Sequence, residues 1–224
     1  DELAQTAWYH MANAYLKSNK KEEARQTFSL CMKIDLNPTI QEEAHYNYVK
    51  LNYELSFNPY HDAIQSVKTY FEKYPESKRT EELKTYLISM FLAGKNYESA
   101  YNTLNDLKNK DLALQQSFQF VAFNLGTDYF YKSEYEKAKK YFGEVKKYPI
   151  DKLINSEGYY WIGESNYNLT NWDDAIQGYN RFLEEPGAIN SAYYTRAQYN
   201  LGYCYMQKGY LSRMDASSNS DITK

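Results

Sequence analysis

The segment that decides the fold is FNLGTDYFYKSEYEKAKKYFGEVKKYP, residues 123–149. Its apolar and small residues recur at helical spacing on both sides of a short polar stretch, which predicts two helices joined by a turn. Gly126 has no side chain and allows a neighbouring helix to pack close to its backbone. Ala138 and Phe142 lie four residues apart on the second helix, which Pro149 ends because it has no N–H to donate. Neither helix can bury its apolar face alone, so the unit requires copies of itself.

The chain carries these copies. The small residue of the second helix recurs at intervals of 37 to 39 residues, as Ala24, Ala63, Ala100, Ala138 and Ala175. A residue suited to cap the N-terminus of a helix precedes each alanine, namely Asn19, Asn58, Asn96, Ser133 and Asn171. The small position of the first helix reads Ala12, Asn52, Ile88, Gly126, Gly163 and Gly202. Repetition at this period predicts a solenoid, in which stacked helix pairs bury a continuous core.

The pattern resembles the tetratricopeptide repeat family. The consensus of that family places an aromatic residue, Leu-Gly and Tyr on the first helix, and Ala, an aromatic residue and Pro on the second. The clearest matches lie in residues 8–38, 125–149 and 162–179, while the units that contain Asn52 and Ile88 match less closely. The resemblance implies an all-α protein, a right-handed α-solenoid of about five and a half helix pairs.

We expect one solenoid domain over residues 1–208. Its repeats are predicted near residues 5–38, 41–75, 79–109, 112–149 and 152–186, with the first helix of a sixth repeat at 191–208. The tail, residues 209–224, is rich in Ser and Asp and has no helical periodicity, so we expect it to be disordered. Leu201 and Tyr205 lack the second helix that would cover them. We therefore expect self-association through this open C-terminal end.

A closer resemblance concerns residues 46–64 and 159–169, which read YNYVKLNYELSFNPYHDAI and YYWIGESNYNL. These runs are similar to large tetratricopeptide repeat proteins of the cell envelope in Bacteroidetes-type bacteria. The resemblance implies a periplasmic or outer-membrane-associated protein. No apolar run approaches the ~20 residues of a membrane span, so we expect no direct membrane insertion. The net charge of −3 indicates no general attraction to nucleic acid.

Residues with catalytic or metal-binding chemistry are few and scattered. His10, His45 and His61 fall in three predicted helices without the spacing of metal ligands, and we interpret them as surface or packing residues. Cys31 and Cys204 are interpreted as buried structural thiols. No nucleophile, base and orienting group can be assembled, so we expect no enzyme, no cofactor and no metal site.

Tyrosine is unusually abundant, with 26 Tyr against 10 Phe. In the family that the repeats resemble, the first helix of each pair lines a concave groove. By that register the groove carries Tyr9, Asn13, Tyr53, Phe123, Tyr160, Glu164, Tyr199 and Tyr203. Tyrosine is enriched where proteins bind proteins, which favours a scaffold that binds a protein or peptide partner. The alternative is a structural or oligomerisation module of a larger envelope protein, in which these rings only cover the seams between helices.

Overall fold

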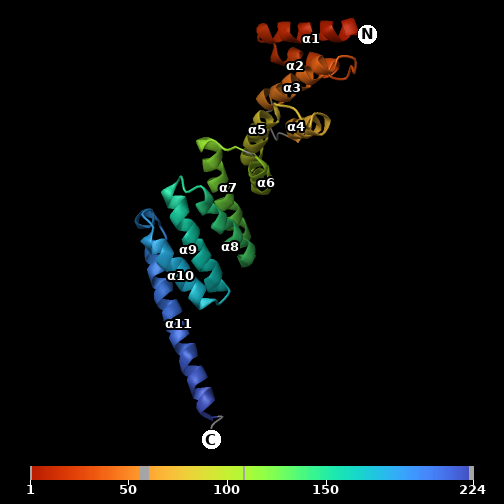
Figure 1. The fold of residues 1–224 in the computed structure, drawn as a ribbon. Helices are drawn as coiled ribbons and strands as arrows, with labels where there is room; N and C mark the ends of the chain where they lie inside the picture. Colours follow the sequence, from red (N-terminus) through yellow and green to blue (C-terminus); the bar gives the residue numbers. More distant parts are fainter. Residues whose placement is uncertain (1, 56–60, 108, 222–224) are drawn as a thin grey trace. The chain divides into compact units, whose positions relative to one another are not determined.

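The structure is a computed structural model that describes residues 2–55, 61–107 and 109–221 (Figure 1). Within these residues it contains eleven α-helices, two short 3-10 helices and no β-strand. The prediction of an all-α protein is therefore confirmed. Contacts between Cα atoms divide the chain into two compact units, residues 1–107 and 108–224, and each unit is described by itself.

The helices follow one another with short connections. The first unit contains α1 (Glu2–Lys17), α2 (Lys21–Cys31), α3 (Pro38–Leu55), α4 (His61–Lys73), α5 (Thr80–Ala93) and α6 (Tyr97–Asp106). The second unit contains α7 (Leu112–Tyr131), α8 (Tyr135–Glu144), α9 (Lys152–Asn168), α10 (Trp172–Glu184) and α11 (Tyr194–Asp221). The 3-10 helices, Val145–Lys147 and Ala188–Asn190, follow α8 and α10.

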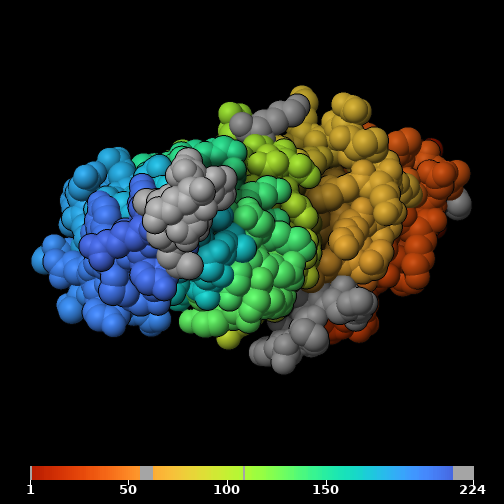
Figure 2. All heavy atoms as spheres, turned by 90° about the horizontal axis from the view of Figure 1, so that it is seen from below, coloured from red at the N-terminus to blue at the C-terminus, as the bar shows by residue number. Residues whose placement is uncertain are grey.

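Packing follows the order of the chain in each unit. In the first unit every helix from α1 to α6 contacts the next, and in the second unit every helix from α7 to α11 does the same. First helices of neighbouring pairs also touch, as α1 does with α3 and α7 with α9. In Figure 2 the atoms of successive helices of the second unit, from green to blue, lie next to one another at the surface. This sequential stacking of helix pairs is the architecture that the repeat predicts.

The small residues lie where the helices meet. The repeated alanines of the second helices, Ala24, Ala63, Ala100, Ala138 and Ala175, are all fully buried. A Cβ atom placed on Gly126 would lie 2.6 Å from the ring of Phe142, and one on Gly163 would lie 2.9 Å from the ring of Tyr179. The two glycines are therefore contact points for large side chains of the second helix, as the sequence predicts.

The predicted caps are only partly right. Asn96 caps α6, because its side chain accepts a hydrogen bond from the Ser99 N–H at 3.2 Å. Asn171 occupies the N-cap position of α10 but makes no capping bond with its side chain. Asn19 and Ser133 lie one residue before the N-cap and have φ angles of 56° and 61°. The capping prediction is therefore wrong for these three residues.

Asn19 and Ser133 form the turns instead. The left-handed conformation recurs at Lys95 (φ 53°) and Thr170 (φ 58°), and all four residues lie five positions before a buried repeat alanine. A left-handed residue reverses the chain direction within few residues, which an antiparallel helix pair requires. The repeat therefore fixes a backbone conformation at this position and not a residue type. The remaining predicted cap, Asn58, lies outside the described residues.

Helix α11 is longer than the sequence predicts. It continues past Lys208 to Asp221, and Figure 1 shows its last turns extending beyond the other helices of the second unit. The stretch contains no proline to stop it. The side chains of residues 209–213 are exposed. The predicted disorder of residues 209–224 stays a prediction, as does the single domain over 1–208.

Candidate partner-binding surfaces

One face of α3 and α5 in the first unit carries three tyrosines around one carboxylate. Tyr46 Oη and Tyr86 Oη both donate to Glu82 Oε1, at 2.7 and 2.9 Å. The ring of Tyr53 stacks on that of Tyr86, with centroids 4.9 Å apart and an interplanar angle of 26°. Lys50 Nζ lies 3.8 Å from Glu82 Oε1. The predicted groove residue Tyr53 is thus one of a row of rings that is already ordered by a central acceptor.

The electrostatics of this face keep the phenols neutral and the carboxylate charged. Burial and the hydrogen bond to Glu82 raise the pKa of Tyr86 to about 12, and the same two causes raise the pKa of Tyr46 above its ordinary value. Burial opposes ionisation of Glu82, but hydrogen bonds from both tyrosines and the charge of Lys50 hold its pKa below its ordinary value. Near neutral pH this face therefore presents phenol rings whose donors are already used.

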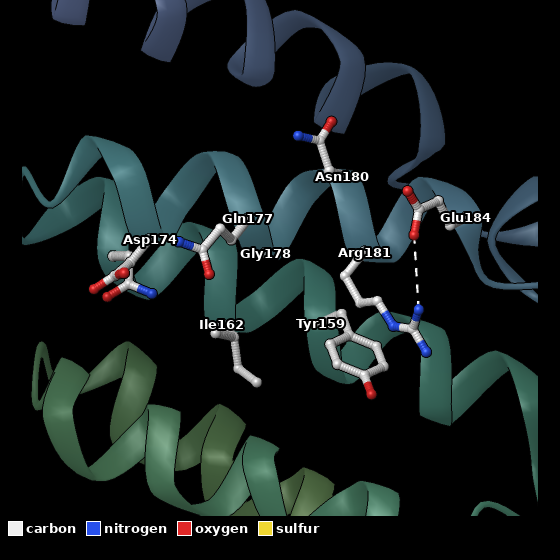
Figure 3. Close-up of a pocket in the computed structure, with 9 residues that line it drawn as sticks. Tyr159, Ile162, Asp174, Gln177, Gly178, Asn180, Arg181 and Glu184 are labelled. Atoms are coloured by element: carbon white, nitrogen blue, oxygen red, sulfur yellow. Dashed lines mark ion pairs between the residues drawn. The ribbon is translucent and has the colours of Figure 1, made fainter.

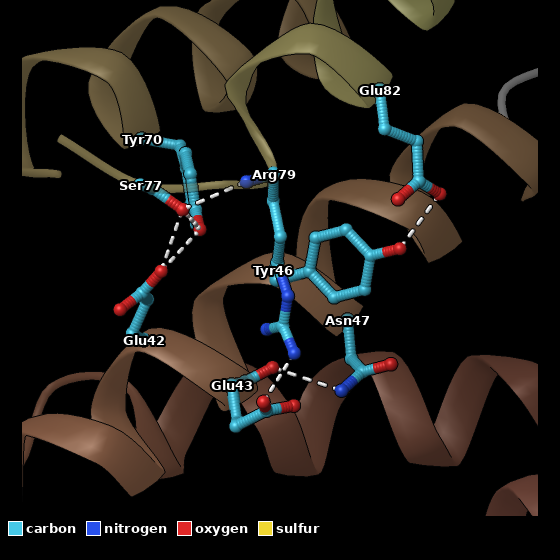
Figure 4. Close-up of polar contacts among 8 residues, drawn as sticks. All are labelled: Glu42, Glu43, Tyr46, Asn47, Tyr70, Ser77, Arg79 and Glu82. Atoms are coloured by element: carbon cyan, nitrogen blue, oxygen red, sulfur yellow. Dashed lines mark hydrogen bonds and ion pairs between the residues drawn. The ribbon is translucent and has the colours of Figure 1, made fainter. Parts of the chain in front are cut away.

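A second polar network lies behind this face (Figure 4). The Arg79 guanidinium lies 4.2 Å from the centroid of the Tyr46 ring and forms an ion pair with Glu43. Tyr70 Oη donates to Glu42 Oε1 at 2.9 Å. Cation–π contacts of Arg with Tyr are attractive, and here the contact joins the start of α5 to α3. The network therefore fixes the orientation of the ring that Tyr46 presents.

Tyr160 in the second unit lies in the core. It is fully buried, and its ring stacks on Tyr193 with centroids 4.6 Å apart and an interplanar angle of 5°. Phe182 of α10 lies 5.5 Å away by the same measure. The prediction that Tyr160 is an exposed groove residue is corrected, because the segment before α11 places Tyr193 over its ring.

Glu164 is also buried, with a relative exposure of 4%. Its Oε1 accepts hydrogen bonds from Tyr179 Oη at 2.8 Å and Asn200 Nδ2 at 2.5 Å, and Arg196 Nη2 lies 3.8 Å from Oε2. Burial and the nearby carboxylate raise the pKa of Tyr179. Glu164 of α9 thus joins α10 and α11. The prediction that Glu164 lies open in a groove is therefore corrected, as it is for Tyr160.

An aromatic surface remains on α9, α10 and α11. The Tyr203 ring lies 5.7 Å from Tyr167 and 6.3 Å from Trp172, measured between centroids. Tyr199 lies one turn before Tyr203 on the same helix face and is 74% exposed. These four residues, Tyr167, Trp172, Tyr199 and Tyr203, are called the aromatic patch below. It combines two predicted groove residues with two that the prediction did not include.

The other predicted groove residues are not part of this patch. Phe123 of α7 is half-buried against Phe142, with ring centroids 5.7 Å apart. Tyr9 of α1 packs edge-on against Phe28 at 6.1 Å. Asn13 donates to the Tyr9 carbonyl at 2.9 Å, so its amide group is engaged by its own helix. Tyr9, Asn13 and Tyr53 belong to the first unit, and the other five belong to the second.

The prediction missed Glu82, Tyr86, Arg196 and Asn200, which hold these surfaces together. Glu82 and Tyr86 lie four residues apart on one helix, a spacing that could have indicated a shared face. No comparable signal links Asn200 to Glu164, because the two residues are 36 positions apart.

The residues with possible ligand chemistry do not converge. Among the described residues no group of three His, Cys, Asp or Glu side chains is arranged to hold a metal ion. His45 is buried against Tyr70 and Tyr74, which confirms that it is a packing residue, and His10 is exposed. The side chain of His61 lies outside the described residues. In the described part of the chain no helix combines the length and the hydropathy of a membrane span.

Comparison with protein families identifies the repeats. Two family models described as tetratricopeptide repeat match residues 5–38 and 157–187. The first match covers α1 and α2 with the following loop, and the second covers most of α9 with α10. Residues 5–38 and 157–187 are thus tetratricopeptide repeats, a kind of repeat that typically serves in protein–protein interaction. No curated protein sequence matches the chain.

Three solved structures that are similar to the chain share low sequence identity with it. The MamA protein is 19% identical, with a TM-score of 0.42, over 82% of this chain and 92% of that chain. A tetratricopeptide repeat protein from Parabacteroides merdae is 12% identical (TM-score 0.42; 99% of this chain, 80% of that one). The TPR2AB domain of yeast Sti1, in complex with pHSP90, is 14% identical (TM-score 0.41; 99% and 97%).

Proposed function

We propose that this protein is a non-catalytic scaffold that binds a protein or peptide partner through the aromatic patch, Tyr167, Trp172, Tyr199 and Tyr203. The observation that supports it most is the exposure of Tyr199, one turn before Tyr203 on α11. The ring centroid of Tyr203 in turn lies within 6.3 Å of those of Tyr167 and Trp172. Tyr and Trp offer large contact areas and lose little side-chain entropy on binding. Such rings are enriched among the residues that dominate binding energy.

In the first unit, the row of Tyr53, Tyr86 and Tyr46 is a weaker candidate for the same role. Its hydroxyl donors are used within the unit, since Tyr46 and Tyr86 both donate to Glu82. Its rings can contribute contact area but fewer new hydrogen bonds. Binding that depends on hydrogen bonds from phenols should therefore rely on the aromatic patch.

The test is a pull-down from extracts of the native cell, followed by affinity measurement with the partner it identifies. Tyr199→Ala and Tyr203→Ala should each weaken binding roughly thirtyfold, which corresponds to about 2 kcal/mol for a central anchor. Tyr131→Ala is a matched control, because Tyr131 is 73% exposed on α7 and lies outside the patch. If both patch variants keep the parent's melting temperature and its affinity, the patch is not the binding site.

A second candidate function is a structural or oligomerisation module of a larger envelope protein. It is favoured by the exposed apolar side chains along α11, where Tyr205, Met206, Tyr210 and Leu211 are between 45% and 61% exposed. Contiguous exposed apolar surface commonly marks an interaction site. Light scattering should then show association that Tyr205→Lys abolishes, and cell fractionation should place the protein with the envelope. A monomer at high concentration would contradict this candidate and leave the first one standing.

A further inference from the structure

A cavity of about 570 Å³ opens between α9 and α10, apart from the aromatic patch (Figure 3). Tyr159, Ile162 and Asn166 of α9 line it, with Gln177, Gly178 and Arg181 of α10. Tyr160 and Glu164 lie between these α9 positions and point into the core, so the cavity uses another face of the helix. It is therefore separate from the surface on which the proposed function rests.

A comparison of the repeats shows which type of residue is usual at the position of Asn166. Three residues after the small position of each first helix stand Tyr15, Leu55, Phe91, Tyr129, Asn166 and Tyr205. Every member of this series is a large apolar or aromatic residue except Asn166. The fifth repeat therefore has a short polar side chain where the other repeats have a large one. Asn166 is itself buried, and its Oδ1 accepts a hydrogen bond from Lys139 Nζ of α8 at 3.1 Å.

The preceding repeat shows how the space is normally used. Tyr129 of α7 stacks on Tyr141 of α8, with centroids 5.4 Å apart and an interplanar angle of 4°. Tyr141 lies three residues after Ala138, and Gly178 lies three residues after Ala175, so Asn166 and Gly178 replace a stacked pair of rings. Both residues line the cavity.

We propose that this cavity binds an aromatic side chain of a partner polypeptide, which packs beside Asn166, the residue that stands where the preceding repeat has Tyr129. Tyr159 and Ile162 supply an apolar wall for the ring. The Arg181 guanidinium lies 5.5 Å from the Tyr159 ring centroid and can cover the edge of a bound ring as well. A Cβ on Gly178 would lie 2.7 Å from Gly163 Cα, so backbone closes the inner end of the cavity.

The rim of the cavity can bind the residues that flank the aromatic side chain in the partner. Gln177 and Asn180 have carboxamides, which can both donate to and accept from a peptide backbone. Figure 3 shows Asp174 at one end of the cavity and the ion pair of Arg181 with Glu184 at the other. Asp174 has no ion-pair partner within the described part of the chain. The occupant therefore carries a basic residue next to its aromatic residue.

The direct test uses the dipeptide acetyl-Lys-Trp-amide and ¹⁵N-resolved NMR spectra of the whole chain. Titration should shift the amide signals of Ile162, Gln177 and Asn180, with a dissociation constant on the order of 1 mM for so small a probe. Acetyl-Glu-Trp-amide and acetyl-Lys-Leu-amide should bind severalfold more weakly. Equal shifts with all three dipeptides, or no shifts on α9 and α10, would overturn the proposal.

Two variants make the result specific. Asn166→Tyr introduces the large residue of the other repeats and should abolish the shifts, whereas Asn102→Tyr on α6 makes the same change at an exposed site and should keep them. Asp174→Lys leaves the cavity open and should reverse the preference between the Lys and Glu dipeptides. Binding that survives Asn166→Tyr, or a preference unchanged by Asp174→Lys, contradicts the proposal. Tyr203→Ala should leave dipeptide binding intact, which separates this site from the aromatic patch.

Discussion

At the scale of single residues, Gly126 and Gly202 hold the same position in their repeats but face different surroundings. A Cβ on Gly126 would meet the Phe142 ring at 2.6 Å, while one on Gly202 would meet nothing within 4 Å. Gly126→Ala should therefore destabilise the protein by about 1–3 kcal/mol through overpacking, and Gly126→Leu by more. Gly202→Ala should stabilise it by up to about 1 kcal/mol through helix propensity. Denaturant unfolding measures both, and a Gly126→Ala variant as stable as the parent would show that the two helices separate without cost.

His45 gives the protein a pH dependence with a defined sign. Burial, and then the charge of Lys73, lower its pKa from 6.5 to about 4. Unfolded His45 therefore binds a proton between these values that the folded residue does not. Its contribution to stability is complete above pH 6.5 and is lost as the pH falls towards 4, by at most about 3 kcal/mol.

The variant His45→Phe isolates this effect, because it keeps an aromatic ring beside Tyr70 and Tyr74 without a titrating group. Between pH 6.5 and 4.5 it should lose less unfolding free energy than the parent does. His10→Phe is the control, since it makes the same change at an exposed histidine. Identical slopes for the parent and His45→Phe would contradict the burial argument.

At the scale of elements, Glu164 connects three helices through one oxygen atom. Glu164→Ala would leave Tyr179 and Asn200 buried without their acceptor, and should cost about 2–4 kcal/mol of unfolding free energy. Glu164→Gln keeps an acceptor oxygen and should cost less. Glu136→Ala, at a carboxylate whose side chain is 72% exposed, should change stability by no more than about 0.5 kcal/mol. Loss of stability in Glu164→Gln as large as in Glu164→Ala would show that the charge matters more than the hydrogen bonds.

The helices were largely predictable from the sequence, but the residues that cover each helix face were not. Ala138 and Gly126 revealed a helix pair because their spacing and size directly reflect the contact between two helices. Tyr160 was misplaced because periodicity shows which side of a helix a residue occupies, and not what covers that side. Its cover, Tyr193, lies 33 residues further along the chain in an irregular segment. Likewise, the turn residues Ser133 and Thr170 share a positive φ angle, which the sequence does not indicate because the two residues are of different types.

At the scale of the whole molecule, the division after Leu107 makes a prediction about folding. Repeat arrays gain stability from each repeat and from its contacts with its neighbours, so a compact group of repeats can fold alone. Fragments 1–107 and 108–224, produced separately, should each give a helical circular dichroism spectrum and a cooperative thermal transition. A fragment that melts without cooperativity would show that its unit depends on the rest of the chain.

The surroundings of Trp161 should allow the second unit to be followed by tryptophan fluorescence. The indole is packed among Phe130, Phe142 and Tyr193, and its Nε1 has no hydrogen-bond partner in the described part of the chain. An indole in such apolar surroundings fluoresces at shorter wavelengths than one in water. The chain has two other tryptophans, Trp8 in the first unit and Trp172 in the aromatic patch. A red shift of the emission at the shortest wavelengths would therefore indicate that the packing around α9 has loosened, even in a protein whose first unit is still folded.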